Sequence, residues 1–356
     1  AEVEGLVPIN VTTVEVRLPF DDFTASSQVF GGYGRTSELG GGFVANDFGD
    51  GLQAGTLVRF GAYPEFAQVV DTLGTSRPDS SLTFLSGRLV ARFDTVGSVA
   101  PGPVTVSAHA LMEEWDPVTT TWVEAVDSAG RRVSWSTPGG GAVTPVGTGV
   151  WDPTTGDSLQ VLLDSATIAS WGDTTNLARG VRLTTSDPTV RLELNSALLW
   201  LDALPSLNPD TIIDVLAQTD DVTFIYDPLP DPPPDGLRVG GAPAWRSILE
   251  VALPEELDGP PELCASLGCP VALTEDVVSF AALRLTTRTP PAAFAPSDTL
   301  SMDLRTVLAP ELLPKSPLGP STLGRVGELL PNELFSAGAG AVVEIPVTGL
   351  VRDLLR

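Results

Sequence analysis

The sequence contains one lysine, Lys315, and one histidine, His109, in 356 residues. Lysine and arginine together number 20 against 45 aspartates and glutamates, so the formal net charge is −25. Because nucleic-acid phosphates are bound by clustered basic side chains, this balance excludes a nucleic-acid partner. It also disfavours docking on anionic lipid, and it is typical of acidic surfaces that keep secreted proteins soluble.

Cysteine is almost as scarce, since only Cys264 and Cys269 occur, in the turn-like run ELCASLGCP. Their spacing matches neither a CxxC redox motif nor a zinc motif, and no histidine lies nearby. A disulfide between them would stabilise the chain by roughly 2 kcal/mol in the chain-entropy model. We therefore expect a disulfide and an oxidising compartment; two free thiols in a surface turn are the alternative.

Long apolar runs are absent, and no stretch reaches the ~18 residues of a membrane span. The chain begins at Ala1 without a basic and apolar leader. We expect an extracellular or cell-surface protein from which a signal peptide has been removed, although trimming would give the same start.

A catalytic residue set is also missing. His109 lies in the alternating segment VTVSAHAL, where a structural role is favoured, and no G-x-S-x-G motif occurs. Glu113, Glu114 and Asp116 flank Trp115 and could serve glycoside hydrolysis, but a solvated turn is favoured. The sequence therefore predicts no enzyme.

The glycine-rich segments do not match known phosphate or metal loops. The run NDFGDG at 46–51 places oxygen ligands in a loop but lacks the spacing and terminal glutamate of an EF-hand. We expect no cofactor, with calcium at this loop as the alternative.

Through most of the chain, apolar and polar residues alternate with a period of two between clusters of Gly and Pro. The alternating segments are rich in Val, Thr, Leu and Phe. Many short strands with frequent turns indicate a sandwich or barrel. We predict an all-β fold of two tandem jelly-roll-like β-sandwich modules. Short helices are expected at 207–217, 320–335 and 348–356.

An internal repeat supports two modules. The paired segments are Thr56–Glu65 with Ser247–Glu256, Leu82–Phe93 with Val277–Arg288, and Asp157–Trp171 with Gly340–Leu355. The predicted organisation is an N-terminal extension at 1–12, a first module at 13–203, a linker with a short helix at 204–220, and a second module at 221–356.

The second copy has no counterpart of the closing hairpin at 178–201 of the first copy. A sandwich without these strands should expose an apolar cleft and unpaired backbone. The N-terminal extension alternates apolar residues and is a candidate donor strand: Val3, Val7, Ile9 and Val11. Truncation of the chain, or disorder at its end, is the alternative explanation of the missing hairpin.

Several segments match a family pattern. In the second module they are LRVGGAPAWRSILEVALP (Leu237–Pro254), FAALRL (Phe280–Leu285) and VEIPVTGLVRDLL (Val343–Leu355). In the first they are WDPVTTTWVEA (Trp115–Ala125), VSWSTPGG (Val133–Gly140) and Asp157–Trp171. The chain thereby resembles the DNRLRE-type modules of secreted bacterial proteins, a group related to carbohydrate-binding module family 96, although the name-giving hexapeptide is absent. The resemblance implies β-sandwiches on extracellular or cell-surface proteins, some of which bind polysaccharide.

Two functions follow as expectations. The first is a structural subunit of an extracellular filament, a homopolymer that assembles head to tail by donation of the N-terminal strand into the second module of a neighbour. The second is a carbohydrate-binding adhesin or appended module. Exposed tryptophans would then bind polysaccharide, with Trp115 and Trp151 as candidates, although packing in the core is the favoured role of these residues.

Overall fold

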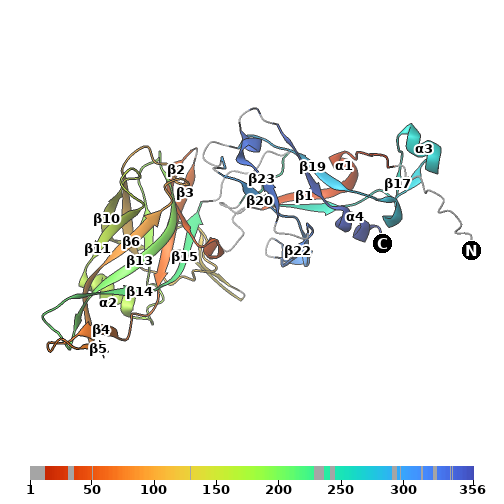
Figure 1. Cartoon of the computed structure of the whole chain (residues 1–356). Coiled ribbons are helices and arrows are strands. Elements are labelled where there is room, and N and C mark those ends of the chain that lie inside the picture. Colours follow the sequence, from red (N-terminus) through yellow and green to blue (C-terminus); the bar gives the residue numbers. More distant parts are fainter. Residues whose placement is uncertain are drawn as a thin grey trace, which may run out of the picture.

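The computed structural model describes residues 13–30, 36–49, 51–128, 130–227, 236–240, 245–290, 295–296, 298–313, 316–323, 327–336, 338 and 340–356. Strands predominate and the helices are short, so the predicted all-β fold is confirmed. The elements gather in two lobes (Figure 1). The first lobe holds one large antiparallel sheet, and the second is assembled from pairs of strands.

The first lobe contains ten strands in one sheet. Eight follow the order β10-β7-β12-β3-β2-β13-β6-β11, while β14 pairs with β13 and β15 pairs with β3. Their bounds are β2 (Gly42–Phe48), β3 (Leu52–Phe60), β6 (Leu82–Phe93), β7 (Val104–Leu111), β10 (Val143–Trp151), β11 (Ser158–Leu163), β12 (Val181–Thr184), β13 (Arg191–Pro205), β14 (Ile213–Ala217) and β15 (Thr219–Tyr226).

The sheet curls into a nearly closed barrel because its two end strands, β10 and β11, approach each other. Glycine permits this approach. A Cβ added at Gly149 would lie 2.8 Å from the carbonyl oxygen of Gln160, and one at Gly147 would lie 2.6 Å from Cγ1 of Val161. Side chains at these two positions would push β11 away.

The barrel core follows from alternation along the strands. On β13 buried and more exposed residues alternate on each side of an irregularity at Leu194–Ser196, and the buried ones include Leu192, Leu194, Leu199 and Leu201. The helix α2 (Ser165–Gly172) closes one side, and the carboxylate of Asp164 caps it by accepting a hydrogen bond from the Thr167 N–H at 2.8 Å. Two hairpins extend from the barrel: β4 (Ala67–Val70) with β5 (Ser76–Asp79), and β8 (Glu124–Ser128) with β9 (Arg131–Ser134).

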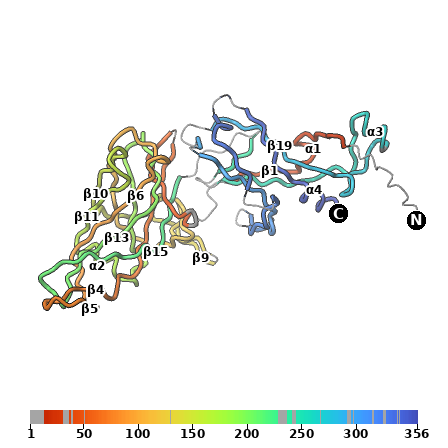
Figure 2. The backbone as a smooth tube through the Cα atoms, viewed as in Figure 1, coloured from red at the N-terminus to blue at the C-terminus, as the bar shows by residue number. Residues whose placement is uncertain are grey.

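The second lobe combines segments from both ends of the described chain. Figure 2 shows the red N-terminal segment running through the same lobe as the blue C-terminal segments. Its strand pairs are β1 (Thr24–Phe30) with β16 (Arg246–Val251), β17 (Glu256–Leu257) with β18 (Val271–Ala272), β19 (Ala282–Thr286) with β24 (Val342–Pro346), β20 (Leu300–Met302) with β23 (Glu328–Leu330), and β21 (Arg305–Val307) with β22 (Leu318–Ser321). Its helices are α1 (Phe20–Phe23), α3 (Pro261–Leu267) and α4 (Thr348–Leu354).

The core of the second lobe is thin. Among the described residues from 236 onward, the buried hydrophobic side chains are Trp245, Val271, Leu330, Val343 and Ile345. The first lobe buries most of its strand side chains on one face, whereas the short strands of the second lobe leave most apolar side chains half-exposed. The described part of the second lobe therefore encloses little apolar volume.

Several predicted elements are wrong. The segment 207–217 forms no helix; its end is β14, in which Val215 and Ala217 are buried because β13 continues far enough to pair with it. The segment 204–220 is thus no linker, and β15 extends the first sheet to Tyr226. The described residues between 320 and 335 form strands and a short 3₁₀ turn, while the helix at 348–356 is confirmed as α4.

The predicted start of the first module at residue 13 also differs from the structure. The strand β1 pairs with β16 from Thr24↔Val251 to Phe30↔Arg246, with a register shift between Thr24 and Ser26, and Ala252 N–H donates to the Phe23 carbonyl at 2.9 Å. A segment that precedes the barrel in sequence therefore completes the other lobe.

Candidate functional site

The two candidate sugar-binding tryptophans are part of the core. The side chain of Trp151 is 0% exposed and that of Trp115 is 2% exposed. The Trp151 indole N–H donates to the Gly156 carbonyl at 3.1 Å, and its ring centroid lies 5.3 Å from that of Phe93. Neither ring face can stack on a pyranose, so a sugar-binding role for Trp115 and Trp151 is wrong.

The carboxylates beside Trp115 are engaged in structural hydrogen bonds. Glu113 accepts hydrogen bonds from the Ser136 backbone N–H and hydroxyl and from the Ala142 N–H, and these bonds outweigh burial to lower its pKa. Glu114 pairs with Arg131 at 2.6 Å, and the hydrogen bond from this guanidinium lowers the glutamate pKa. Both are therefore deprotonated, and neither is suited to act as a general acid at neutral pH.

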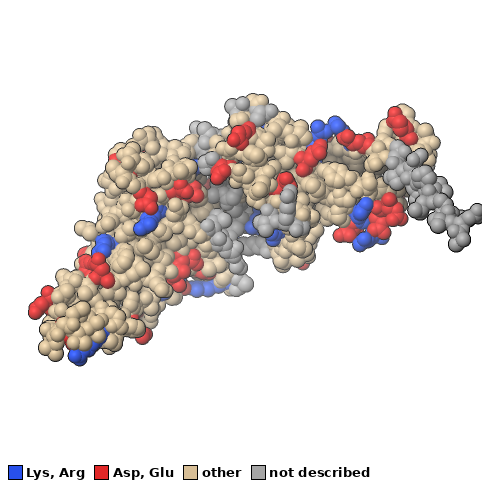
Figure 3. Space-filling model, in the orientation of Figure 1, with Lys and Arg blue, Asp and Glu red and all other residues tan. Residues whose placement is uncertain are grey.

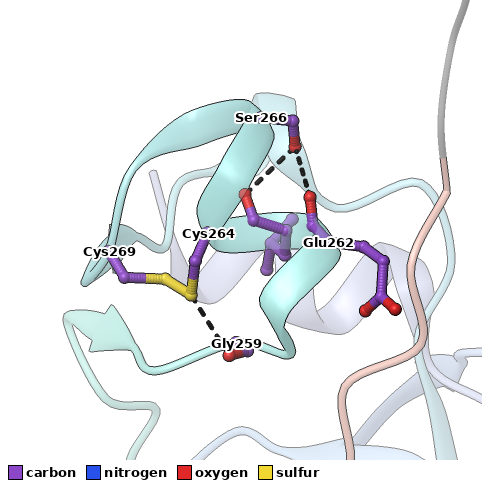
Figure 4. Close-up of a disulfide and its surroundings, with 6 residues drawn as sticks. Gly259, Glu262, Cys264, Ser266 and Cys269 are labelled. Carbon is purple, nitrogen blue, oxygen red and sulfur yellow. Dashed lines mark hydrogen bonds between the residues drawn. A yellow bond between two sulfur atoms is a disulfide. The ribbon is translucent and has the colours of Figure 1, made fainter.

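The two cysteines form the expected disulfide, with a separation of 2.00 Å between the sulfur atoms. Figure 4 shows Cys264 on α3 and Cys269 in the loop that follows it. The Cys264 sulfur lies 3.2 Å from the carbonyl oxygen of Gly259. The bridge closes α3 against the chain that leads into β18.

The predicted donor residues Val3, Val7, Ile9 and Val11 lie outside the described residues, which begin at Thr13. The segment that follows is extended, with Val14, Val16 and Leu18 half-buried and the residues between them exposed. The pKa of Glu15 is lowered by the hydrogen bond and charge of Arg17 and, to a smaller extent, by the charge of Arg284 on β19. Alternate side chains of this segment are therefore half-buried, and the charge of Arg284 on β19 acts on Glu15.

The pair β19–β24 presents an open edge. Its hydrogen bonds join the Val347 N–H to Ala281 and the Thr287 N–H to Ala341, both at 2.8 Å. Because hydrogen-bonded and non-hydrogen-bonded positions alternate along an antiparallel pair, Val343 and Ile345 point their backbone groups at β19. Val342 and Glu344 direct theirs outward, and no described strand pairs with that edge of β24.

The side chains of β24 alternate accordingly. Val343 and Ile345 are buried and pack with Leu330 in the small core of the lobe, whereas Val342, Glu344 and Pro346 are exposed. A further strand at this edge would add a backbone ladder, and its inward side chains would enlarge the same core. The edge thus combines unpaired backbone with an adjoining apolar cluster.

A pocket lies elsewhere in the same lobe. Its volume is about 500 Å³, and it is lined mainly by apolar side chains from the end of β16, from β18 and from α4: Val251, Leu253, Ala272, Leu273, Leu354 and Leu355. Other large apolar side chains of this lobe reach solvent, including Phe280, Leu329 and Val342. The lobe therefore has more apolar surface than its own described strands cover.

On the face shown in Figure 3, acidic and basic side chains form small separate groups. Arg284 and Glu344 face each other across β19 and β24 with a nitrogen–oxygen distance of 3.9 Å. Within the described ranges no three His, Cys, Asp or Glu side chains gather as metal ligands, and no helix is long and apolar enough to cross a membrane.

Comparison of the chain with family models, with curated proteins and with solved structures finds no match. The resemblance to DNRLRE-type modules therefore stays a prediction. The pairing of β1 with the second lobe was not expected from the sequence. Its only signal was the second alternating segment at Val14, Val16 and Leu18, directly before this strand.

Proposed function

We propose that the protein is a structural subunit of an extracellular filament, in which residues 1–12 of one copy add a strand to the second lobe of its neighbour. The acceptor is the outer edge of β24, and Val7, Ile9 and Val11 of the donor face the core beneath it. The observation that carries this proposal is the open edge of β24 beside a thin apolar core. The disulfide fits an oxidising, extracellular location.

The energetics favour such an addition. A donated strand would gain a ladder of backbone hydrogen bonds, each contributing about 0.5–1.5 kcal/mol net. Each apolar side chain that becomes fully buried would add about 1.5–3 kcal/mol. Pro8 has no N–H, so its position must face away from β24. With three inward side chains, these gains can exceed the cost of ordering a short segment.

The proposed contact between donor and acceptor would also repeat from one copy to the next. The donor of each copy binds a different surface of the next copy, so the interface is heterologous and continues into a filament unless it closes into a ring. The carbohydrate-binding alternative loses support, because its two candidate aromatics are buried in the barrel.

Deletion of residues 1–12 tests the proposal. The full chain should form fibres visible by electron microscopy, whereas the deleted chain should remain monomeric with an unchanged circular dichroism spectrum. The matched control is Asn10→Asp, which keeps the apolar positions of the donor intact and should still polymerise. Fibres formed equally well by the deleted chain would rule out donation from this end.

A further inference from the structure

An arginine whose Nε is buried without a hydrogen-bond partner among the described residues lies on the outer face of the barrel. Arg182 is on β12, where its neighbours Val181 and Leu183 are buried in the core, so its side chain projects to the opposite face. That face is covered in part by the β8–β9 hairpin through a second apolar cluster, which includes Leu57, Ala125 and Trp135. The guanidinium is half-buried at the margin of this cluster.

Two features hold Arg182 in place. Across the sheet it lies directly opposite His109 on β7 and Leu57 on β3. Above it passes the glycine loop that follows Trp135. A Cβ added at Gly139 would lie 3.5 Å from Nη2 of Arg182, and one at Gly140 would lie 3.1 Å from its Cδ. The backbone of the loop therefore rests against the arginine.

Both basic groups have unsatisfied atoms. Nε of Arg182 and Nδ1 of His109 are buried without a hydrogen-bond partner in the part of the chain that the structure describes. Burial lowers the pKa of Arg182, and burial followed by the charge of Arg182 lowers the pKa of His109. Two basic side chains thus stand side by side with no opposing charge among the described residues.

The neighbouring charged side chains of Glu113 and Arg59 already have other hydrogen-bond partners. Glu113, beside the same glycine loop, accepts hydrogen bonds from Ser136 and Ala142. Arg59, on the same face of β3, donates to the backbone carbonyls of Trp115 and Leu177. An unpaired half-buried cation is costly, and the cost is removed when an anion binds it.

We infer that Arg182 and His109 form a binding site for a carboxylate. The planar guanidinium presents two parallel N–H groups, which match the two oxygens of a carboxylate. His109 adds a second charged donor when it is protonated. The site is independent of the second lobe and of strand donation.

His109 reports directly on the site because it is the only histidine in the chain. Its pKa can be measured on the full chain by NMR of the imidazole carbons, at constant ionic strength, in sodium acetate and in sodium chloride. A bound carboxylate favours the imidazolium, so acetate should raise the His109 pKa in a saturable manner while chloride should not. A rise with protein concentration in chloride alone would also support the site, with the carboxylate supplied by a second copy.

Arg182→Gln separates binding from general solvent effects. Removal of the neighbouring positive charge should raise the His109 pKa in chloride, and it should abolish the further rise in acetate. Arg77→Gln, on the distant β5, is the matched control and should leave the acetate effect unchanged. If acetate and protein concentration both leave the His109 pKa unchanged, or if the acetate effect persists in Arg182→Gln, the inference is wrong.

Discussion

Replacement of Trp151 by alanine is expected to lower the free energy of unfolding of the first lobe by about 3–5 kcal/mol. The side chain is fully buried in the barrel, packs against Phe93 and donates its indole N–H to Gly156. Its removal leaves a large cavity and an unpaired carbonyl. Urea denaturation followed by circular dichroism measures the loss.

The matched control is the adjacent Val150→Ala, since Val150 is 63% exposed on the same strand. Its effect should stay within about 0.5 kcal/mol. A loss of less than about 1 kcal/mol for Trp151→Ala would contradict its place in the core and would reopen a role in ligand binding.

Glu344→Pro is expected to block assembly without unfolding the lobe. The Glu344 N–H points outward from β24, at a position that does not hydrogen-bond with β19. Proline removes this donor and places its ring where an incoming strand must lie. The concentration needed for fibre formation should rise on the order of tenfold or more, because a loss of 1.4 kcal/mol is a factor of ten.

Glu344→Gln is the control for this variant. It removes the same charge, and with it the exposed pair with Arg284, but keeps the backbone N–H. Exposed ion pairs contribute little, so this variant should polymerise like the parent. Light scattering against protein concentration compares the three proteins, and equal thresholds for Glu344→Pro and the parent would exclude the edge of β24 as the acceptor.

Local alternation predicted the strands of the barrel, since a period of two shows which residues share a face. Pairing between distant segments was not predictable in this way. The segment 207–217 carries a pattern compatible with a short helix, and only the continuation of β13 past Leu201 makes its end a strand. The pairing of β1 with β16 joins residues more than 200 positions apart, which no local pattern specifies.

The candidate sites differ in how far the sequence alone could predict them. The disulfide was predictable because a short loop brings Cys264 and Cys269 together whatever the fold. The burial of Trp115 and Trp151 agrees with the core packing that the sequence favoured, whereas the partners of each ring, such as Phe93 beside Trp151, come from the structure. The contact between Arg182 and His109 depends on the register of β12 against β7, and nothing in the sequence indicates that register.

Binding of a donor peptide to the second lobe tests strand donation most directly. A peptide of residues 1–12 is titrated into the chain that lacks this segment, and binding is followed by isothermal titration calorimetry. We predict saturable binding at one peptide per chain, which Glu344→Pro weakens and which a peptide with Val7 and Ile9 replaced by aspartate does not reproduce. No binding of the native peptide, or equal binding of the aspartate peptide, would contradict strand donation.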